Sequence, residues 1–249
     1  MNRLYSGQLW LEMMAQLVAL ESAVYPTQPP PANESAFTHI PGTLPILISA
    51  PHSTAHWRNG HLKKEEGFTA AISHYIAMAT GAHALYTHYQ SEKDPNWHKA
   101  APYKSALAHI LSQQRIKFVL DLHGMSNRYN IGLALGTING RSCPQHEQPI
   151  IQTLQAHGFY QTSLAHAREL EQLQWQQFIV NHPRFTGGVT SHTVTRFVSQ
   201  EVGIPAAQLE LCTLLRVVPP HYQRYKTLLR GLETAVNTLI TLVQTLTNR

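Results

Sequence analysis

Charged residues are scarce in this sequence: Asp, Glu, Lys and Arg make up 13% of its 249 residues, about half the usual share in globular domains. Acids are the scarcest, with 14 Asp and Glu against 19 Lys and Arg, which gives a formal net charge of +5. The sequence contains no run of four basic residues, so it lacks the clustered Lys and Arg of a nucleic-acid-binding protein. A modest positive charge suits an anionic small-molecule substrate.

Cysteine pairs and long apolar runs are missing as well. Cys143 and Cys212 form no CxxC pair, so we expect no disulfide framework and a cytoplasmic location. No window of 18 apolar residues is present to span a membrane. Glu12, Gln16 and Glu21 interrupt the first apolar stretch, unlike the apolar core of a secretory signal. These absences argue against a membrane partner and against a secreted disulfide-rich domain.

The sequence does contain alternating helical and strand patterns. A helix over residues 2–24 and a Pro-rich linker form a predicted N-terminal segment, 1–33, ahead of a single α/β domain over 34–249. The helix either packs on that domain or forms a partner-binding arm. The patterns predict strands over 44–50, 83–89, 116–124, 129–137 and 205–215, and helices over 65–81, 104–114, 147–158, 193–203 and 221–246. With a hairpin between 116–122 and 129–137, they predict a three-layer α/β/α sandwich around a mixed sheet.

Ionisable side chains accompany three of the predicted strands. His52 follows strand 44–50, His123 lies near the end of strand 116–124, and Glu210 lies within strand 205–215. Ligands of open α/β sheets gather at the carboxyl ends of strands. Burying a charge there is costly unless a partner or a metal compensates. Two histidines and one carboxylate suit a catalytic zinc with an open fourth position, so we predict a zinc (Zn²⁺) site.

The predicted carboxylate ligand comes from the first turn of the helix over 65–81. Glu65 and Glu66 both lie there, and the spacing of the apolar residues after them favours Glu66, with Glu65 as the alternative. Asp121 is a candidate hydrogen-bond partner of the metal-site histidines. With sixteen His in the chain, we expect most others, including His56, to be ordinary surface or core residues.

Several short motifs extend this pattern. They are APHS (50–53), EEGFT (65–69), DPN (94–96), DLHG (121–124), GLALGTINGRSC (132–143), NHPRFTGG (181–188) and QLEL (208–211). In this order they resemble the N-formylglutamate amidohydrolase family, which belongs with the zinc carboxypeptidase-like hydrolases. The resemblance implies a carboxypeptidase-like sandwich with zinc on His52, Glu66 and His123. It also implies that Glu210 is the catalytic carboxylate. Trp97 stands where members of that family often have Arg.

The implied reaction is zinc-dependent hydrolysis of an amide bond in a small anionic N-acyl amino acid, similar to N-formylglutamate, or in a short peptide. Glu210 would accept the proton of the attacking water, a role that contributes about 10²–10⁴-fold in rate. Arg128 is predicted to help hold the oxyanion. Arg side chains pair with both oxygens of a carboxylate, and the predicted substrate contacts are Asn96, Arg141, Asn181 and Arg184, with Arg128 and Arg196 as further candidates for the carboxylate.

Two other functions stay open at this point. One is a peptidase or deacylase that acts on a different acyl group, and the other is a non-catalytic binding protein that keeps the fold. Metal content separates the enzymes from the binding protein. About one zinc per chain favours a hydrolase, whereas absence of metal with a retained fold favours a binding protein.

Overall fold

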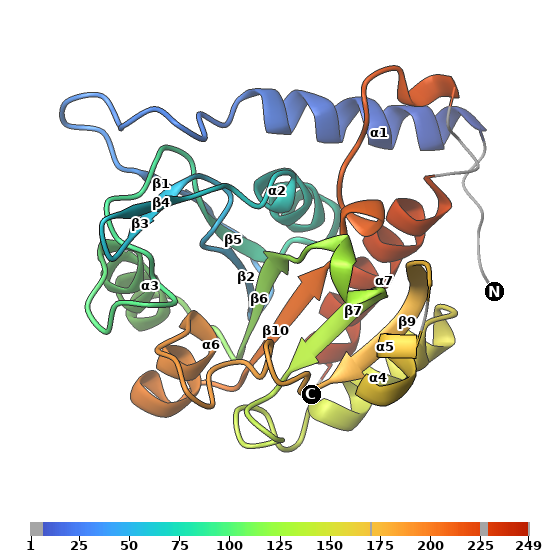
Figure 1. The fold of residues 1–249 in the computed structure, drawn as a ribbon. Coiled ribbons are helices and arrows are strands. Elements are labelled where there is room, and N and C mark those ends of the chain that lie inside the picture. The colour runs from blue at the N-terminus through green and yellow to red at the C-terminus, as the bar shows by residue number, and fades with distance from the viewer. Residues whose placement is uncertain (1–6, 170, 225–228, 249) are drawn as a thin grey trace.

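The computed structural model describes residues 7–169, 171–224 and 229–248 (Figure 1). Its centre is an eight-stranded sheet with the order β1-β5-β2-β6-β10-β7-β9-β8, and β3 and β4 form a separate hairpin. The strands are β1 (Phe37–Ile40), β2 (Ile46–Ala50), β3 (His56–Arg58), β4 (His61–Lys63), β5 (His83–Thr87), β6 (Phe118–Gly124), β7 (Ile131–Gly136), β8 (Tyr160–Gln161), β9 (Gln174–Val180) and β10 (Ala206–Leu211).

Helices cover both faces of this sheet. They are α1 (Gly7–Ser22), α2 (Thr69–Thr80), α3 (Pro102–Gln113), α4 (Glu147–Ala156), α5 (Leu164–Glu169), α6 (Val194–Arg196), which continues as a π-helical turn over Phe197–Val202, and α7 (Arg230–Thr247). Three short 3-10 turns lie at Asn127–Tyr129, Thr213–Leu215 and Tyr222–Arg224. The predicted helix over 221–246 therefore begins only at residue 230 within the described residues, and 225–228 lie outside them.

The alternation of apolar side chains along each central strand divides the core into two layers. In β2, Ile46 and Ile48 belong to a cluster with α2, α4 and α7, whereas Leu47 between them packs with α3 and α6. In β6, Phe118 faces the first cluster and Val119 the second. The predicted three-layer α/β/α arrangement is confirmed.

The sheet is mixed, as predicted, but for a different reason. β1 pairs antiparallel with β5 and β7 with β10, and the other neighbouring pairs are parallel. The predicted hairpin between 116–122 and 129–137 is wrong, because β10 lies between β6 and β7 and pairs with both. Closeness along the chain suggested the pairing. The wholly buried strand β10, which begins 70 residues after the end of β7, is instead inserted between the two strands.

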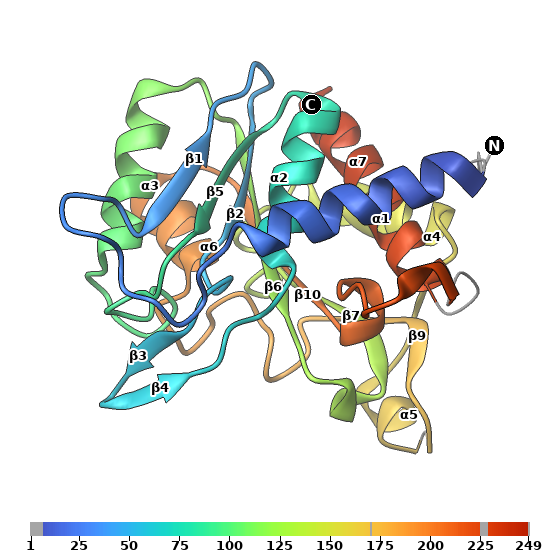
Figure 2. The same cartoon turned by 90° about the horizontal axis from the view of Figure 1, so that it is seen from above.

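The first helix packs on the domain. Trp10, Met13, Met14 and Leu17 of α1 are buried and share the large core cluster with α2. Figure 2 shows α1 lying across the outer side of α2. Within the described residues, no helix is long and apolar enough to cross a membrane, and both cysteines are buried free thiols.

The start of α2 differs from the prediction. The helix begins at Thr69 and not at residue 65, because Phe68 takes the left-handed conformation (φ 68°), which interrupts the helix. Glu65 and Glu66 therefore lie in the loop before α2 and not in its first turn. The strand predicted over 205–215 also ends early, at Leu211, where a 3-10 turn follows.

Candidate metal centre and cavity

Three adjacent strands present polar side chains on one face of the sheet. Ser49 of β2, Asp121 of β6 and Gln208 of β10 lie side by side in register, and His123 of β6 pairs with Glu210 of β10 one step farther along. Paired residues on neighbouring strands are about 5 Å apart. The register therefore brings His123 and Glu210 together at the carboxyl end of the sheet, where the loops after β2 also arrive.

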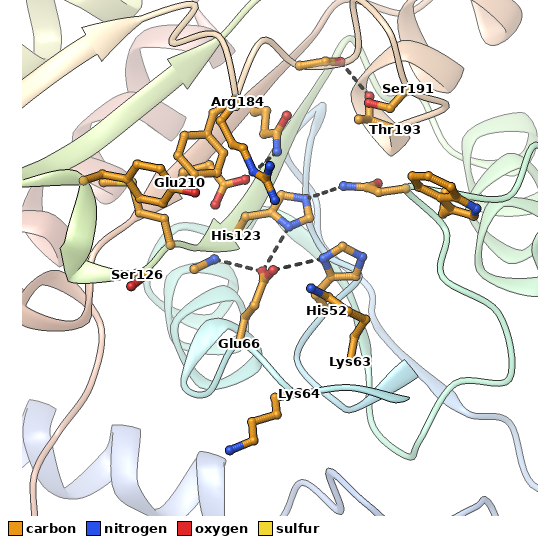
Figure 3. A pocket seen from close by; sticks show the side chains of 18 of the residues that line it. His52, Lys63, Lys64, Glu66, His123, Ser126, Arg184, Ser191, Thr193 and Glu210 are labelled. Atoms are coloured by element: carbon orange, nitrogen blue, oxygen red, sulfur yellow. Dashed lines mark hydrogen bonds and ion pairs between the residues drawn. The ribbon is translucent and has the colours of Figure 1, made fainter. Parts of the chain in front are cut away.

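His52, Glu66 and His123 meet at this edge of the sheet (Figure 3). Nδ1 of His52 lies 3.1 Å from Oε1 of Glu66, and Nδ1 of His123 lies 3.0 Å from Oε2. The backbone N–H of Gly124 also donates to Oε2, at 2.9 Å. One ligand atom from each of the three side chains lies within 4.8 Å of the others. The three residues predicted as ligands are thus brought together, and the structure places Glu66 rather than Glu65 beside the histidines.

The far nitrogens of both imidazoles face carboxylates. Nε2 of His52 lies 2.9 Å from Oδ1 of Asp94, and Nε2 of His123 lies 3.2 Å from Oδ2 of Asp121. Asp121 is itself held by the hydroxyl of Ser49. Metal-binding histidines almost always donate their second ring N–H to such a group. Both Nδ1 atoms face Glu66, so they are the ring nitrogens that a metal ion beside Glu66 would bind, and the donor set fits a metal ion.

The charges of this group also favour a cation. Burial alone would lower the pKa of His52, but Glu66 and Asp94 outweigh it and raise that pKa to about 9. Asp121 and Glu66 likewise raise the pKa of buried His123 well above its usual value. Burial opposes ionisation of Glu66, yet the two histidines hold its pKa well below the usual range. A cluster that binds protons this firmly is an anionic environment in which a divalent cation can replace them.

A second group of possible ligands, His52, His56 and Asp94, adjoins the first. His56 is buried and its ring stacks on that of His52, with 4.1 Å between the centroids. The guanidinium of Arg58, however, contacts Oδ2 of Asp94 through both Nε and Nη2 at 2.5 Å. This fixed positive charge opposes a second cation, so the His52–Glu66–His123 group is the better metal site. The sequence predicted that His56 is an ordinary surface or core residue. Its spacing of four residues from His52 was the only feature of the sequence that pointed to a place beside the metal site.

A cavity of about 1040 Å³ opens above the three residues. Glu210 lies in its wall, 6% exposed, and accepts a hydrogen bond of 2.7 Å from Nε2 of Gln208. Burial raises the pKa of Glu210 to about 7, although His123 counteracts it. Gln208 and Glu210 share the face of β10 opposite Leu209, whereas Cys212 lies beyond the strand and packs in the apolar core.

Cations surround this cavity. The charged residues that line it are Arg58, Lys63, Lys64, Arg128, Arg184 and Arg216, against Glu65, Glu66 and Glu210. Figure 3 shows Arg184 reaching toward Glu210 and His123. The guanidinium of Arg128 lies 5.1 Å from the centre of the Tyr129 ring at the exposed rim. The arrangement offers positive side chains to an anionic ligand above a negative floor.

The other predicted substrate contacts are spread more widely. Asn96 lines the cavity, but its side chain accepts from the N–H of Val194 and approaches Nε2 of His123. Arg141, Asn181 and Arg196 are not among the residues that line the cavity. Their polar groups bond within loops: Arg141 to the carbonyl of residue 138, Asn181 to the backbone of residues 137 and 139, and Arg196 to the carbonyl of residue 188. These contacts give the three side chains loop-forming roles.

Sequence reasoning gave Arg216 no role. Its Nε donates to the carbonyl of Leu211 at 3.3 Å, and its Nη1 donates to the carbonyl of Gly67 in the loop that carries Glu66. A Cβ on Gly124 would lie only 2.5 Å from Nε of Arg216. A larger residue at this position of the DLHG motif would therefore displace the Arg216 side chain from its present place.

No protein-family model matches the sequence, and a search of curated proteins found no relative. Solved structures are similar in fold. A gene product from Agrobacterium tumefaciens has a TM-score of 0.53 and 13% identity, with 87% of this chain and 96% of that chain covered. N-formylglutamate amidohydrolase from Ralstonia eutropha has a TM-score of 0.48 and 14% identity (86% and 98% covered). A bacteriophage poly-gamma-glutamate hydrolase has a TM-score of 0.46 and 12% identity (85% and 90% covered). At such low identity these matches concern the fold alone.

Proposed function

We propose that this protein is a zinc-dependent hydrolase that cleaves an amide bond in a small N-acyl amino acid or short peptide bearing a carboxylate. The convergence of both imidazole Nδ1 atoms on the two oxygens of Glu66 carries the proposal. The carboxylates behind the imidazoles and Glu210 beside them complete the set of groups that such a reaction needs.

When bound at His52, Glu66 and His123, zinc would supply a Lewis acid for the amide carbonyl and for water. Glu210 accepts a proton from the attacking water and then delivers it to the nitrogen of the leaving amine. A pKa near 7 suits both transfers, because the carboxyl group exchanges a proton readily at neutral pH. Arg128 or Arg184, both at the cavity, is the candidate to hold the oxyanion or the substrate carboxylate.

The proposal is tested first by metal analysis and then by a substrate screen. The purified protein should contain, or bind, about one zinc per chain, and the zinc-loaded form should hydrolyse members of a panel of N-acyl amino acids and short peptides. Stoichiometric zinc without turnover on any amide would favour a binding protein with this fold. A folded protein that binds no zinc would overturn the proposal.

Exchanging Glu66 for glutamine should abolish tight zinc binding, whereas the same exchange at Glu65 should leave the zinc affinity within about twofold. The reason is that Glu66 faces both imidazoles, whereas Glu65 is exposed at the cavity wall. The two neighbours are matched controls for charge and position in the chain. Zinc affinity is measured by competition with a chromophoric chelator. Loss of zinc in the Glu65 variant alone would show that Glu65, and not Glu66, is the ligand.

Arg184→Gln should lower kcat/KM for acidic substrates more than for neutral ones. Losing a charge-assisted pair costs about 1.5–3 kcal/mol, or roughly ten- to a hundredfold in kcat/KM. The measurement compares kcat/KM for a carboxylate substrate with that for its neutral amide, in the parent and in the variant. Arg141→Gln is the control, since Arg141 lies outside the cavity lining. Equal kcat/KM for acid and amide in the parent protein would argue against any carboxylate clamp.

A further inference from the structure

Glu66 stands on a loop and not on a helix, so its position depends on what fixes that loop. The N–H of Glu66 donates to the carbonyl of His52 at 2.8 Å, and its carbonyl accepts from Thr69 at 3.2 Å. Between these points, Phe68 takes the left-handed conformation. Phe68 is the N-cap residue of α2, and its side chain makes no capping hydrogen bond. Left-handed backbone is costly for a residue with a side chain. Contacts from elsewhere must therefore stabilise the peptide that follows Glu66.

The first of these contacts comes from the N-terminal helix. Oε1 of Glu21, near the end of α1, accepts a hydrogen bond of 2.7 Å from the N–H of Phe68. In Figure 2 this end of α1 lies over the segment that leads into α2. The helix is itself fixed, because Trp10 and Leu17 among others are buried in the core. Glu21 is thus a carboxylate on a firmly packed element that holds the loop by its backbone.

The second contact comes from the opposite end of the chain. Nη1 of Arg216 donates to the carbonyl of Gly67. The carbonyl of Gly67 and the N–H of Phe68 belong to one peptide unit, and a peptide unit is planar and rigid. Arg216 and Glu21 therefore hold the two ends of a single plane, which fixes its orientation. That plane begins one residue after Glu66.

We propose that Glu21 is a positioning residue of the metal site, and that α1 is present partly to hold the Glu66 carboxylate between His52 and His123. The inference rests on the proposed metal centre. Groups that orient metal ligands typically contribute about 10–100-fold to metal affinity. Glu21→Ala removes the acceptor of the Phe68 N–H and should weaken zinc binding by a factor in this range, although Glu21 does not face the metal site itself.

The experiment measures zinc affinity by chelator competition in the full-length protein, together with the absorption spectrum of the cobalt-substituted form. Glu12→Ala is the matched control, because Glu12 is the other acid of α1, is exposed, and accepts its hydrogen bond from Gln8 of the same helix. Glu21→Asp is a second variant, which keeps the charge but draws the carboxylate back by one methylene. We expect both Glu21 variants to lose zinc affinity and to shift the cobalt spectrum, and Glu12→Ala to do neither.

Thermal unfolding of the metal-free variants separates positioning from general stability. A Glu21 variant that is less stable yet binds zinc with parental affinity and an unchanged cobalt spectrum overturns the inference. If only one of Glu21→Ala and Glu21→Asp folds, the same result in that variant overturns the inference. Absence of zinc binding in the parent protein would instead overturn the proposed function.

Discussion

Replacing His123 by alanine should remove most of the bound zinc and reduce hydrolysis by the same measure. His123 supplies one of three ligands, and its imidazole is buried with Glu66 on one side and Asp121 on the other. The loss should exceed the roughly 100-fold that altering an outer partner of a ligand brings. Zinc per chain after dialysis and the affinity by chelator competition give the result. Since Asp121 loses one of its partners and keeps the hydroxyls of Ser49 and Thr195, thermal unfolding of the variant should be followed so that only folded protein is compared.

His56→Ala is the control that distinguishes the two groups of possible ligands. His52 belongs to both, whereas His123 belongs only to the group with Glu66 and His56 only to the group with Asp94. We expect the His56 variant to keep its zinc, because the Asp94 carboxylate is already paired with the guanidinium of Arg58 and is a poor ligand for a metal ion. The reverse outcome, zinc lost with His56 and kept without His123, would move the metal to the neighbouring group.

The parts of the fold that the sequence predicted are those with a strong local pattern. β2, β6 and β10 are buried along nearly their whole length and read as short apolar runs. β9 was missed because its first half alternates Gln with Trp175 and starts with the exposed Gln174 and the half-buried Trp175, so only its last residues form an apolar run. β1 was missed because it is a four-residue edge strand of half-buried residues. Strand order depends on contacts between distant segments, so the position of β10 between β6 and β7 left no trace in local periodicity.

The candidate site divides in the same way. His52, His123 and Glu210 were predictable because each is a polar residue at an apolar strand. The register of β6 with β10 then places His123 beside Glu210. Asp94 reaches His52 from a loop 42 residues away, and no spacing rule predicts such a contact. Arg141, although part of the motif over 132–143, bonds to its own loop instead of lining the cavity.

Glu210→Gln should keep both fold and zinc and lose hydrolysis by about 10²–10⁴-fold, the usual contribution of general acid–base catalysis. The amide has almost the same shape and its oxygen can still accept the hydrogen bond from Gln208, so the strand should be undisturbed. It cannot take a proton from water, so the chemical step should fail while substrate binding persists. The measurement is kcat of the zinc-loaded variant on a verified substrate, with Glu65→Gln, an exposed acid of the same cavity, as the control.

The pH profile gives this prediction its sharpest form. Glu210 must be ionised to accept a proton, so kcat/KM of the parent should rise with pH through the pKa of that carboxyl. Burial places this pKa at about 7, and the charge of a bound cation lowers it, so the rising limb should lie at or below pH 7. In Glu210→Gln the same limb should disappear from the residual activity. Near-normal turnover with the limb intact would make Glu210 structural, and loss of zinc together with fold would make it a ligand or the partner of one.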